Sequence, residues 1–309
     1  MSDVTDPGID GALDDESGTT AGSLETAEGT VEEKTLGIGF YLAIAWLIVI
    51  VTLAVFAPWL PLKDPDANFV DIQGKGRPPY RPSGEHWMGT DRDARDMFSR
   101  IIFGARVSLV VGFASVAFGF LVGGTIGLVG GFIRGWFDRL TSFIMIVLLS
   151  FPALILAILI TSLMERSLFT IAMTLGILSI APVSRLARSA SLVFAEREFV
   201  TAARAMGAKP SHIMIRELLP NVLIPMSALA LLGTAVAIVA EGGLAFLGLS
   251  VEKGSTWGKL ILIGADTKTL EDAPWIAFGP VLALFLTVMA LNYAGDRLRD
   301  YFDVRELAL

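Results

Sequence analysis

The chain has no cysteine and only two histidines, His86 and His212, in 309 residues. The absence of cysteine excludes disulfides, iron–sulfur ligation and thiol nucleophiles. Neither histidine has a partner at the spacing of a metal site, so we expect lone surface histidines, no metal and no cofactor. A GxxxxGK[ST] phosphate-binding loop is also missing, and the apolar runs contain no paired acids. We therefore expect no enzymatic activity, and any use of ATP requires a separate subunit.

Basic residues are missing from the first 33 positions, which hold ten of the 31 acidic residues. The same segment is rich in Gly, Ser and Thr and has almost no large apolar residue, so burial cannot offset the entropy of ordering it. We predict a disordered, acidic tail over residues 1–34. The net charge of −7 arises in that tail, because all 24 basic residues lie after position 33.

Long charge-free runs are abundant: 53% of the residues are hydrophobic and the mean hydropathy is +0.64. A helix that crosses a bilayer core about 30 Å thick needs about 20 apolar residues. The runs are too long and lack the alternation of barrel strands, so helices are the only spanning solution. We predict an all-α, polytopic membrane protein with six transmembrane helices. The runs are 36–62, 107–133, 140–164, 167–184, 222–240 and 273–294.

The distribution of Lys and Arg over the short connections favours both termini in the cytoplasm. Residues 35–62 are then the first span, 63–106 an extracytoplasmic segment, 107–297 a core of five spans, and 298–309 a cytoplasmic tail. The extracytoplasmic segment begins rich in Pro and Gly, as in an irregular loop. From Asp91 to Arg106 its apolar residues share a helical face, which predicts an interfacial helix before the second span.

The polar loop between the fourth and fifth spans, residues 185–221, is too long for a turn. Its first half favours a helix, Gly207 ends that helix, and Pro210 starts a second one that we expect to end before Pro220. Ala202, Ala203 and Ala205 offer a flat surface for close packing. The basic edge beside them could contact a soluble partner; it comprises Arg204, Lys209 and Arg216.

This loop resembles the cytoplasmic signature of the inner-membrane permeases of binding-protein-dependent ABC importers. That signature reads Glu-Ala-Ala, three residues, Gly, nine residues, Ile, any residue, Leu-Pro. Thr201 occupies the Glu position and Glu217 the Ile position, while the other positions match in type and spacing. Glu198, about one turn earlier, could make the contact of the missing Glu. The resemblance implies that the loop couples the chain to an ATPase, through Glu198, Thr201, Ala202, Ala203, Arg204, Gly207, Lys209, Leu219 and Pro220.

Four further blocks are similar to the second (C-type) permease of the dipeptide, oligopeptide and nickel branch, with Ala94 in place of the usual Gly. They are "HWMGTD" to "GAR" over 86–106, "FLGLS" at 246–250, "WG" at 257–258 and "NYAGDRLRDYFDVR" at 292–305. The resemblance implies a type I importer permease that translocates peptides, with nickel or another small solute as the alternative. It also implies as partners a homologous second permease, two ATP-binding subunits and an extracytoplasmic binding protein, but no nucleic acid.

A secondary transporter is the more remote alternative. Such carriers place ionisable groups near the bilayer midplane, and here the only candidate is Glu241, at the end of the fifth run. This side chain is either a gate or substrate contact in the translocation path, or a hydrogen-bonded carboxyl packed against a neighbouring helix. One acid does not make a proton relay, and no inverted repeat is evident.

Overall fold

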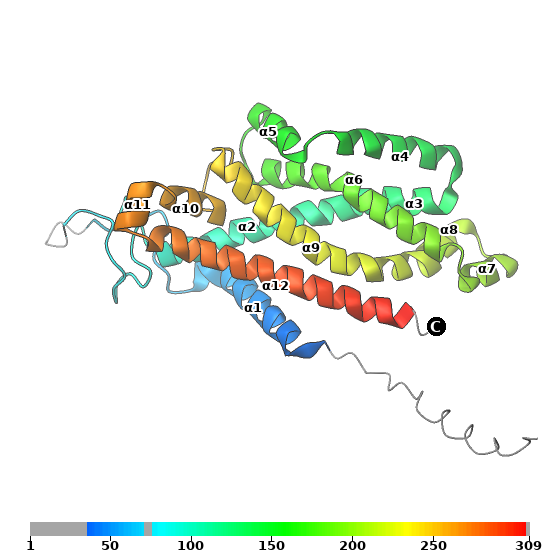
Figure 1. The fold of residues 1–309 in the computed structure, drawn as a ribbon, viewed down its shortest axis with the longest axis horizontal. Coiled ribbons are helices and arrows are strands. Elements are labelled where there is room, and N and C mark those ends of the chain that lie inside the picture. The colour runs from blue at the N-terminus through cyan, green and yellow to red at the C-terminus, as the bar shows by residue number, and fades with distance from the viewer. Residues whose placement is uncertain (1–35, 71–75, 307–309) are drawn as a thin grey trace, which may run out of the picture. The chain divides into compact units, whose positions relative to one another are not determined.

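The computed structural model describes residues 36–70 and 76–306, so the predicted disordered tail lies outside the described part (Figure 1). Within it the regular structure is helical, with one isolated bridge between Thr90 and Asp96 and no strand. This confirms the predicted all-α class. Five of the described helices are long and apolar enough to cross a membrane, or six spans if one bent pair is counted as a span.

The helices follow the order of the apolar runs, although most extend beyond them. The spanning helices are α1 (Gly37–Phe56), α2 (Met97–Gly119) continued through a π turn into α3 (Thr125–Ile133), α6 (Leu168–Phe194), α9 (Leu219–Phe246) and α12 (Trp275–Glu306). The bent pair is α4 (Gly135–Ser150) and α5 (Ala153–Leu163). Shorter elements are α7 (Glu198–Ala205), α8 (Pro210–His212), the π turn η3 (Ile213–Leu218), α10 (Trp257–Gly264) and α11 (Thr267–Asp272).

The predicted interfacial helix over 91–106 is wrong. Helix α2 begins only at Met97, where the side chain of Asp96 caps it by accepting a hydrogen bond from the Ser99 amide at 2.9 Å, and it continues into the span. Met97 and Ile101 are buried in the main apolar core, so they face protein and not the membrane surface. Apolar spacing alone does not distinguish these two environments.

The third span is broken, whereas the sequence predicted one run over 140–164. Helices α4 and α5 meet at an angle of 85°. Pro152 causes the break, because it has no amide donor and it forces the preceding residue out of the helical region. Phe151 accordingly has an extended backbone.

Glycines hold the second span against α6. A Cβ atom at Gly119 would lie 2.1 Å from the Ser179 hydroxyl, and one at Gly127 would lie 2.2 Å from the carbonyl oxygen of Ser184. Small residues at four-residue spacing let two backbones approach where lipid supplies no hydrophobic drive for association. This helix is therefore packed closely on one face.

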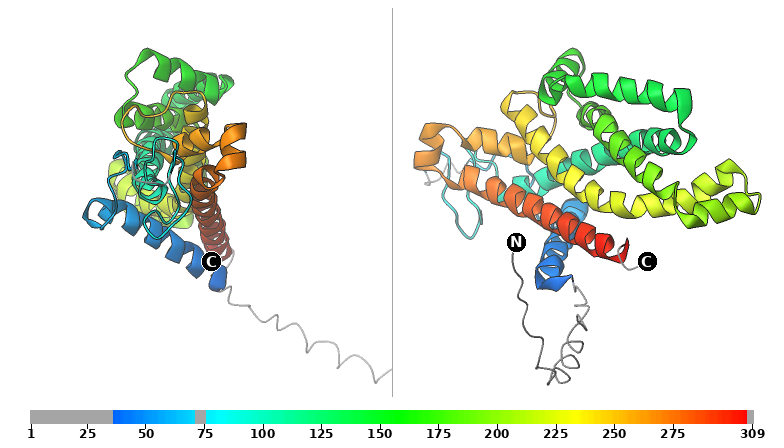
Figure 2. Two further views of the ribbon diagram at one scale, coloured as in Figure 1. Left: turned by 90° about the vertical axis from the view of Figure 1, so that its left-hand side faces the viewer. Right: turned by 45° about the vertical axis from the view of Figure 1, so that its right-hand side comes forward.

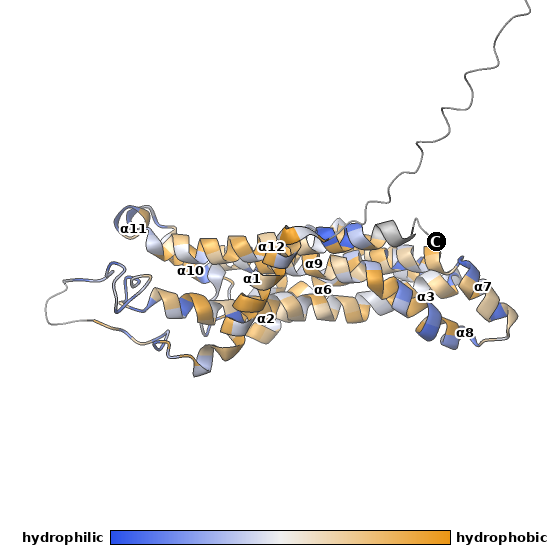
Figure 3. Ribbon diagram, turned by 90° about the horizontal axis from the view of Figure 1, so that it is seen from below, coloured by the Kyte–Doolittle hydropathy of each residue, from blue (hydrophilic) through white to orange (hydrophobic). Residues whose placement is uncertain are grey.

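Polar segments gather at both ends of the apolar bundle. Figures 1 and 2 place α7 and α8 near the end of α12 at one side, and α10 and α11 at the other. In Figure 3 the helices between are coloured mainly hydrophobic, while α7, α8 and α11 carry hydrophilic residues. The two candidate sites of the sequence, the 185–221 loop and Glu241, therefore belong to different parts of the bundle.

Candidate functional site

Helix α7 is set by local sequence. It starts at Glu198, whose carboxylate in the first turn suits the positive end of the helix dipole. It ends in a Schellman motif: the Ala208 amide donates to the Ala203 carbonyl at 3.0 Å and the Gly207 amide donates to the Arg204 carbonyl at 3.0 Å. Gly207 has φ +80°, a conformation that glycine adopts without strain.

The second short helix does not end before Pro220. It runs from Pro210 through η3 into α9, so that residues 210–246 form one continuous helical segment. The wider π turn before Pro220 relieves the clash that a proline ring makes with the preceding turn of an α-helix. The side-chain amide of Asn221 donates a hydrogen bond to the neighbouring carbonyl oxygen of Glu217 at 2.6 Å.

The two alanines of the signature point in different directions. Ala203 is 7% exposed and packs in a small cluster with Val200 and Ile213, whereas Ala202 is exposed. The expected flat surface therefore does not include Ala203, because neighbours in a helix lie about 100° apart and Ala203 is turned inward. The outward face of α7 is formed by exposed side chains of the helix, Ala202 among them, and by the residue that follows the helix. We call it the α7 outer face: Thr201, Ala202, Ala205 and Met206, the last 81% exposed.

The α3–α4 turn supports this segment from the side. Phe132 packs against the Val200 cluster, and the guanidinium of Arg204 lies 5.7 Å from its ring centroid. Arg134, in the same turn, pairs with Glu196 at 2.8 Å. Phe132 lies 72 positions before Arg204, and no local pattern in the sequence marks it as part of this site.

A shallow basic groove lies on the segment that comes after α7 in the chain. Its lining includes the exposed side chains of Lys209 and Arg216, together with His212, which is exposed as predicted. Leu219 is half-buried at the start of α9 and Pro220 is exposed. The signature thus combines residues at the surface with residues that fix the fold of the segment.

Glu241 is enclosed between three elements and is 1% exposed. The Ser250 hydroxyl donates to its Oε1 at 2.9 Å, and the Ser108 hydroxyl on α2 lies 3.5 Å from its Oε2. The Ser108 oxygen in turn accepts from the Trp257 amide at 3.2 Å. The carboxyl therefore joins α9, α2 and the loop that leads into α10.

Lys259 closes the same loop. Its ammonium donates to the carbonyl oxygens of Val251, Glu252 and Gly254 at 2.6, 3.2 and 3.1 Å. Burial lowers the pKa of Lys259 from its usual value, and the nearby charge of Arg100 acts in the same direction. Three carbonyl acceptors nevertheless satisfy the charged form, so this lysine holds the loop around Glu241.

The "HWMGTD" block and the residues after it form a buried ionic cluster at the start of α2. Asp91 is 1% exposed and pairs with Arg100 and, at 3.1 Å, with Arg95. His86 lies 2.8 Å from Asp96 and is 5% exposed, so its prediction as a surface histidine is wrong. Because buried charges are costly unless paired, these residues serve to fix the turn. No group of three metal-ligating side chains occurs among the described residues.

Comparison with known proteins agrees with the helical architecture. Residues 119–306 match the family described as the binding-protein-dependent transport system inner membrane component. The dipeptide transport system permease protein DppC of Alkalihalophilus pseudofirmus is 37% identical over 267 residues, which cover 85% of each chain. The glutathione transport system permease protein GsiD of Pectobacterium atrosepticum is 34% identical over 84% of each chain.

Among solved structures, a chain of the MetNI methionine ABC transporter in an inward-facing conformation superposes with a TM-score of 0.55. The match covers 66% of this chain and 97% of that chain, at 21% identity. At this identity the likeness concerns the fold alone.

Proposed function

Because the chain belongs to the family of inner membrane components of binding-protein-dependent transport systems, we propose that it is a permease subunit of an ATP-driven peptide importer. The printed functions of its relatives, dipeptide and glutathione transport, support short peptides as the substrate class. The observation that carries the mechanism is the α7 outer face, an exposed platform fixed to a continuous helix that reaches Glu241.

The energy for transport would come from two ATP-binding subunits, one of which docks on the α7 outer face. We place this end of the bundle and both termini in the cytoplasm. A homologous second permease would complete the translocation path, and a binding protein would deliver peptide at the opposite end, near α10 and α11. The chain itself would act as a transport component without catalytic residues.

The continuous segment from Pro210 to Phe246 suits the transmission of movement. At about 1.5 Å per residue, its 37 residues span about 55 Å. Displacement of the coupling residues by an ATPase would therefore tilt α9 as a unit and strain the hydrogen bonds of Glu241 to Ser250 and Ser108. In this proposal Glu241 belongs to the moving core and holds it together, without contacting substrate.

A cysteine crosslinking experiment tests the docking surface. The natural chain contains no thiol, so a single introduced cysteine is unique in this subunit. In the assembled complex, cysteines at Thr201 or Met206 should form crosslinks with a cysteine scan of the ATPase groove, and the yield should change with ATP. A cysteine at Ile213, which is 1% exposed, is the matched control and should give none. Absence of crosslinks across the whole α7 outer face would overturn the proposed docking.

An uptake assay separates the alternatives. Proteoliposomes that contain the complete complex should accumulate a labelled dipeptide only with ATP and the binding protein. Accumulation of nickel in place of the dipeptide would favour the small-solute alternative. Uptake that continues with ATPase subunits unable to hydrolyse ATP would favour a secondary transporter.

A further inference from the structure

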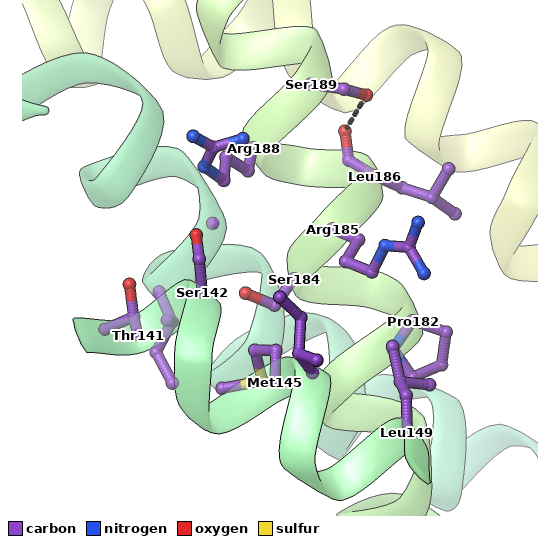
Figure 4. A pocket seen from close by; sticks show the side chains of 13 residues that line it. Thr141, Ser142, Met145, Leu149, Pro182, Ser184, Arg185, Leu186, Arg188 and Ser189 are labelled. Atoms are coloured by element: carbon purple, nitrogen blue, oxygen red, sulfur yellow. Dashed lines mark hydrogen bonds between the residues drawn. The ribbon is translucent and has the colours of Figure 1, made fainter. Parts of the chain in front are cut away.

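A cavity of about 630 Å³ lies between α4 and α6, and neither Glu241 nor the residues of α7 line it (Figure 4). One part of its lining is apolar and includes Met145, Leu149 and Pro182. Hydroxyl groups of Thr141, Ser142 and Ser184 supply hydrogen-bonding positions. Ligand-binding pockets typically measure about 300–1,000 Å³ and combine an apolar wall with a few polar groups. The size and lining of this cavity therefore suit a small ligand that has both apolar and hydrogen-bonding groups.

Arg188, one of two arginines at the cavity, is already neutralised. Its guanidinium donates to the two carboxylate oxygens of Asp138 at 2.5 and 2.7 Å, in a bidentate pair that links α6 to α4. Ser142 lies 3.5 Å from the same carboxylate. This pair has its charge satisfied within the chain and holds one wall of the cavity in place.

Arg185, the second arginine, is exposed and has no acidic partner among the described residues. Figure 4 shows Arg185 and Arg188 leaving α6 in different directions, with Arg188 toward Ser142 and Arg185 away from it. Arg185 lies in a helix long and apolar enough to span the membrane. Charged residues in such helices generally face a partner or a water-filled space, because lipid does not solvate them. The cavity therefore has one uncompensated positive charge.

We propose that this cavity is a transit site for the peptide and that Arg185 binds the carboxylate at the peptide's C-terminus. The proposal rests on the proposed function and adds the chemical group that is recognised. Guanidinium and carboxylate match in planar, bidentate geometry. The hydroxyl groups can pair with the peptide backbone, and the flexible Met145 can adapt to different side chains. Such a site recognises the backbone and the C-terminal carboxylate, which all peptides share. A partner subunit would better suit a flat helix face than a hollow of ligand size.

The test compares charge removal at two arginines. Arg185→Gln removes the charge at the cavity, and Arg139→Gln removes one from an exposed position of α4 outside the cavity lining. Complete complexes with the binding protein are reconstituted in proteoliposomes. The substrates are a labelled dipeptide with a free carboxylate and the same dipeptide as its C-terminal amide, each saturating the binding protein.

We expect Arg185→Gln to reduce uptake of the free dipeptide at least tenfold, with normal assembly and ATP hydrolysis, and to leave uptake of the amide nearly unchanged. The ratio of acid to amide uptake should therefore fall, Arg185→Lys should restore part of it, and Arg139→Gln should match wild type. An unchanged ratio would overturn the proposal. Loss of assembly would overturn it in favour of a contact with the partner permease, and an effect that depends on anionic lipid alone would overturn it in favour of a headgroup. Failure of the proposed function itself would look different, because wild type would then import neither peptide.

Discussion

Replacing Gly207 by valine should disconnect the ATPase from the permease by unwinding the end of α7. Gly207 has φ +80°, and an added Cβ atom would meet nothing within 4 Å, so the entire cost is backbone strain and not a steric clash. For a residue with a side chain, the left-handed conformation costs about 1–2 kcal/mol. That strain opposes the two hydrogen bonds of the Schellman motif, to the carbonyls of Ala203 and Arg204.

The consequence is large for so short a helix. Helix α7 has eight residues, and isolated helices of fewer than about 12–15 residues are marginal in water. A loss of about 1–2 kcal/mol corresponds to roughly a 5- to 30-fold increase in the unwound fraction of the segment. The spans should remain folded, because Gly207 lies in the turn after α7, outside the spanning helices.

Hydrogen exchange of the α7 amides in the purified complex measures the unwinding, and copurification of the ATPase measures docking. Gly207→Asn is the matched control, since asparagine tolerates the left-handed region better than other residues with side chains. From the Asn to the Ala to the Val variant, the α7 amides should exchange faster and less ATPase should copurify. Equal behaviour of the Asn and Val variants would refute the argument, since it would show that backbone conformation at this position does not hold the docking surface.

Three further sets of substitutions test the remaining sites. Ala203→Asp should destabilise the segment by placing a carboxylate in the Val200 cluster, whereas Ala202→Asp, on the exposed side, should impair ATPase docking without changing proteolytic resistance of the free subunit. Glu241→Gln should preserve thermal stability in detergent and most uptake, while Glu241→Leu should cost about 1–3 kcal/mol by leaving hydroxyl groups unsatisfied; uptake by the Gln variant below a tenth of wild type, with normal assembly, would instead identify a substrate contact. Asp138→Ala should lower the melting temperature more than the Asp138→Ala, Arg188→Met double variant, because the single change leaves the arginine without its partner; equal losses would contradict a bidentate pair that matters for stability.

The predictions from sequence succeeded where one short stretch of chain contains the cause. Pro210 starts a helix and Gly207 ends one, as their local sequence predicts. They failed where a residue has two possible environments. Met97 and Ile101 have the spacing of an interfacial helix, and the same spacing fits the buried core that they occupy.

The sequence by itself determined that this chain is a helical membrane protein, because the length and polarity of an apolar run decide locally whether a helix can cross a bilayer. It also determined the end of α7 at Gly207 and the start of the next helix at Pro210. Only the tertiary structure decided which side chains meet. Glu241 and Ser108 are 133 positions apart, and Arg188 and Asp138 are 50 apart. Such pairs form because helix packing brings distant faces together, and the inward direction of Ala203 follows from the same packing against Ile213.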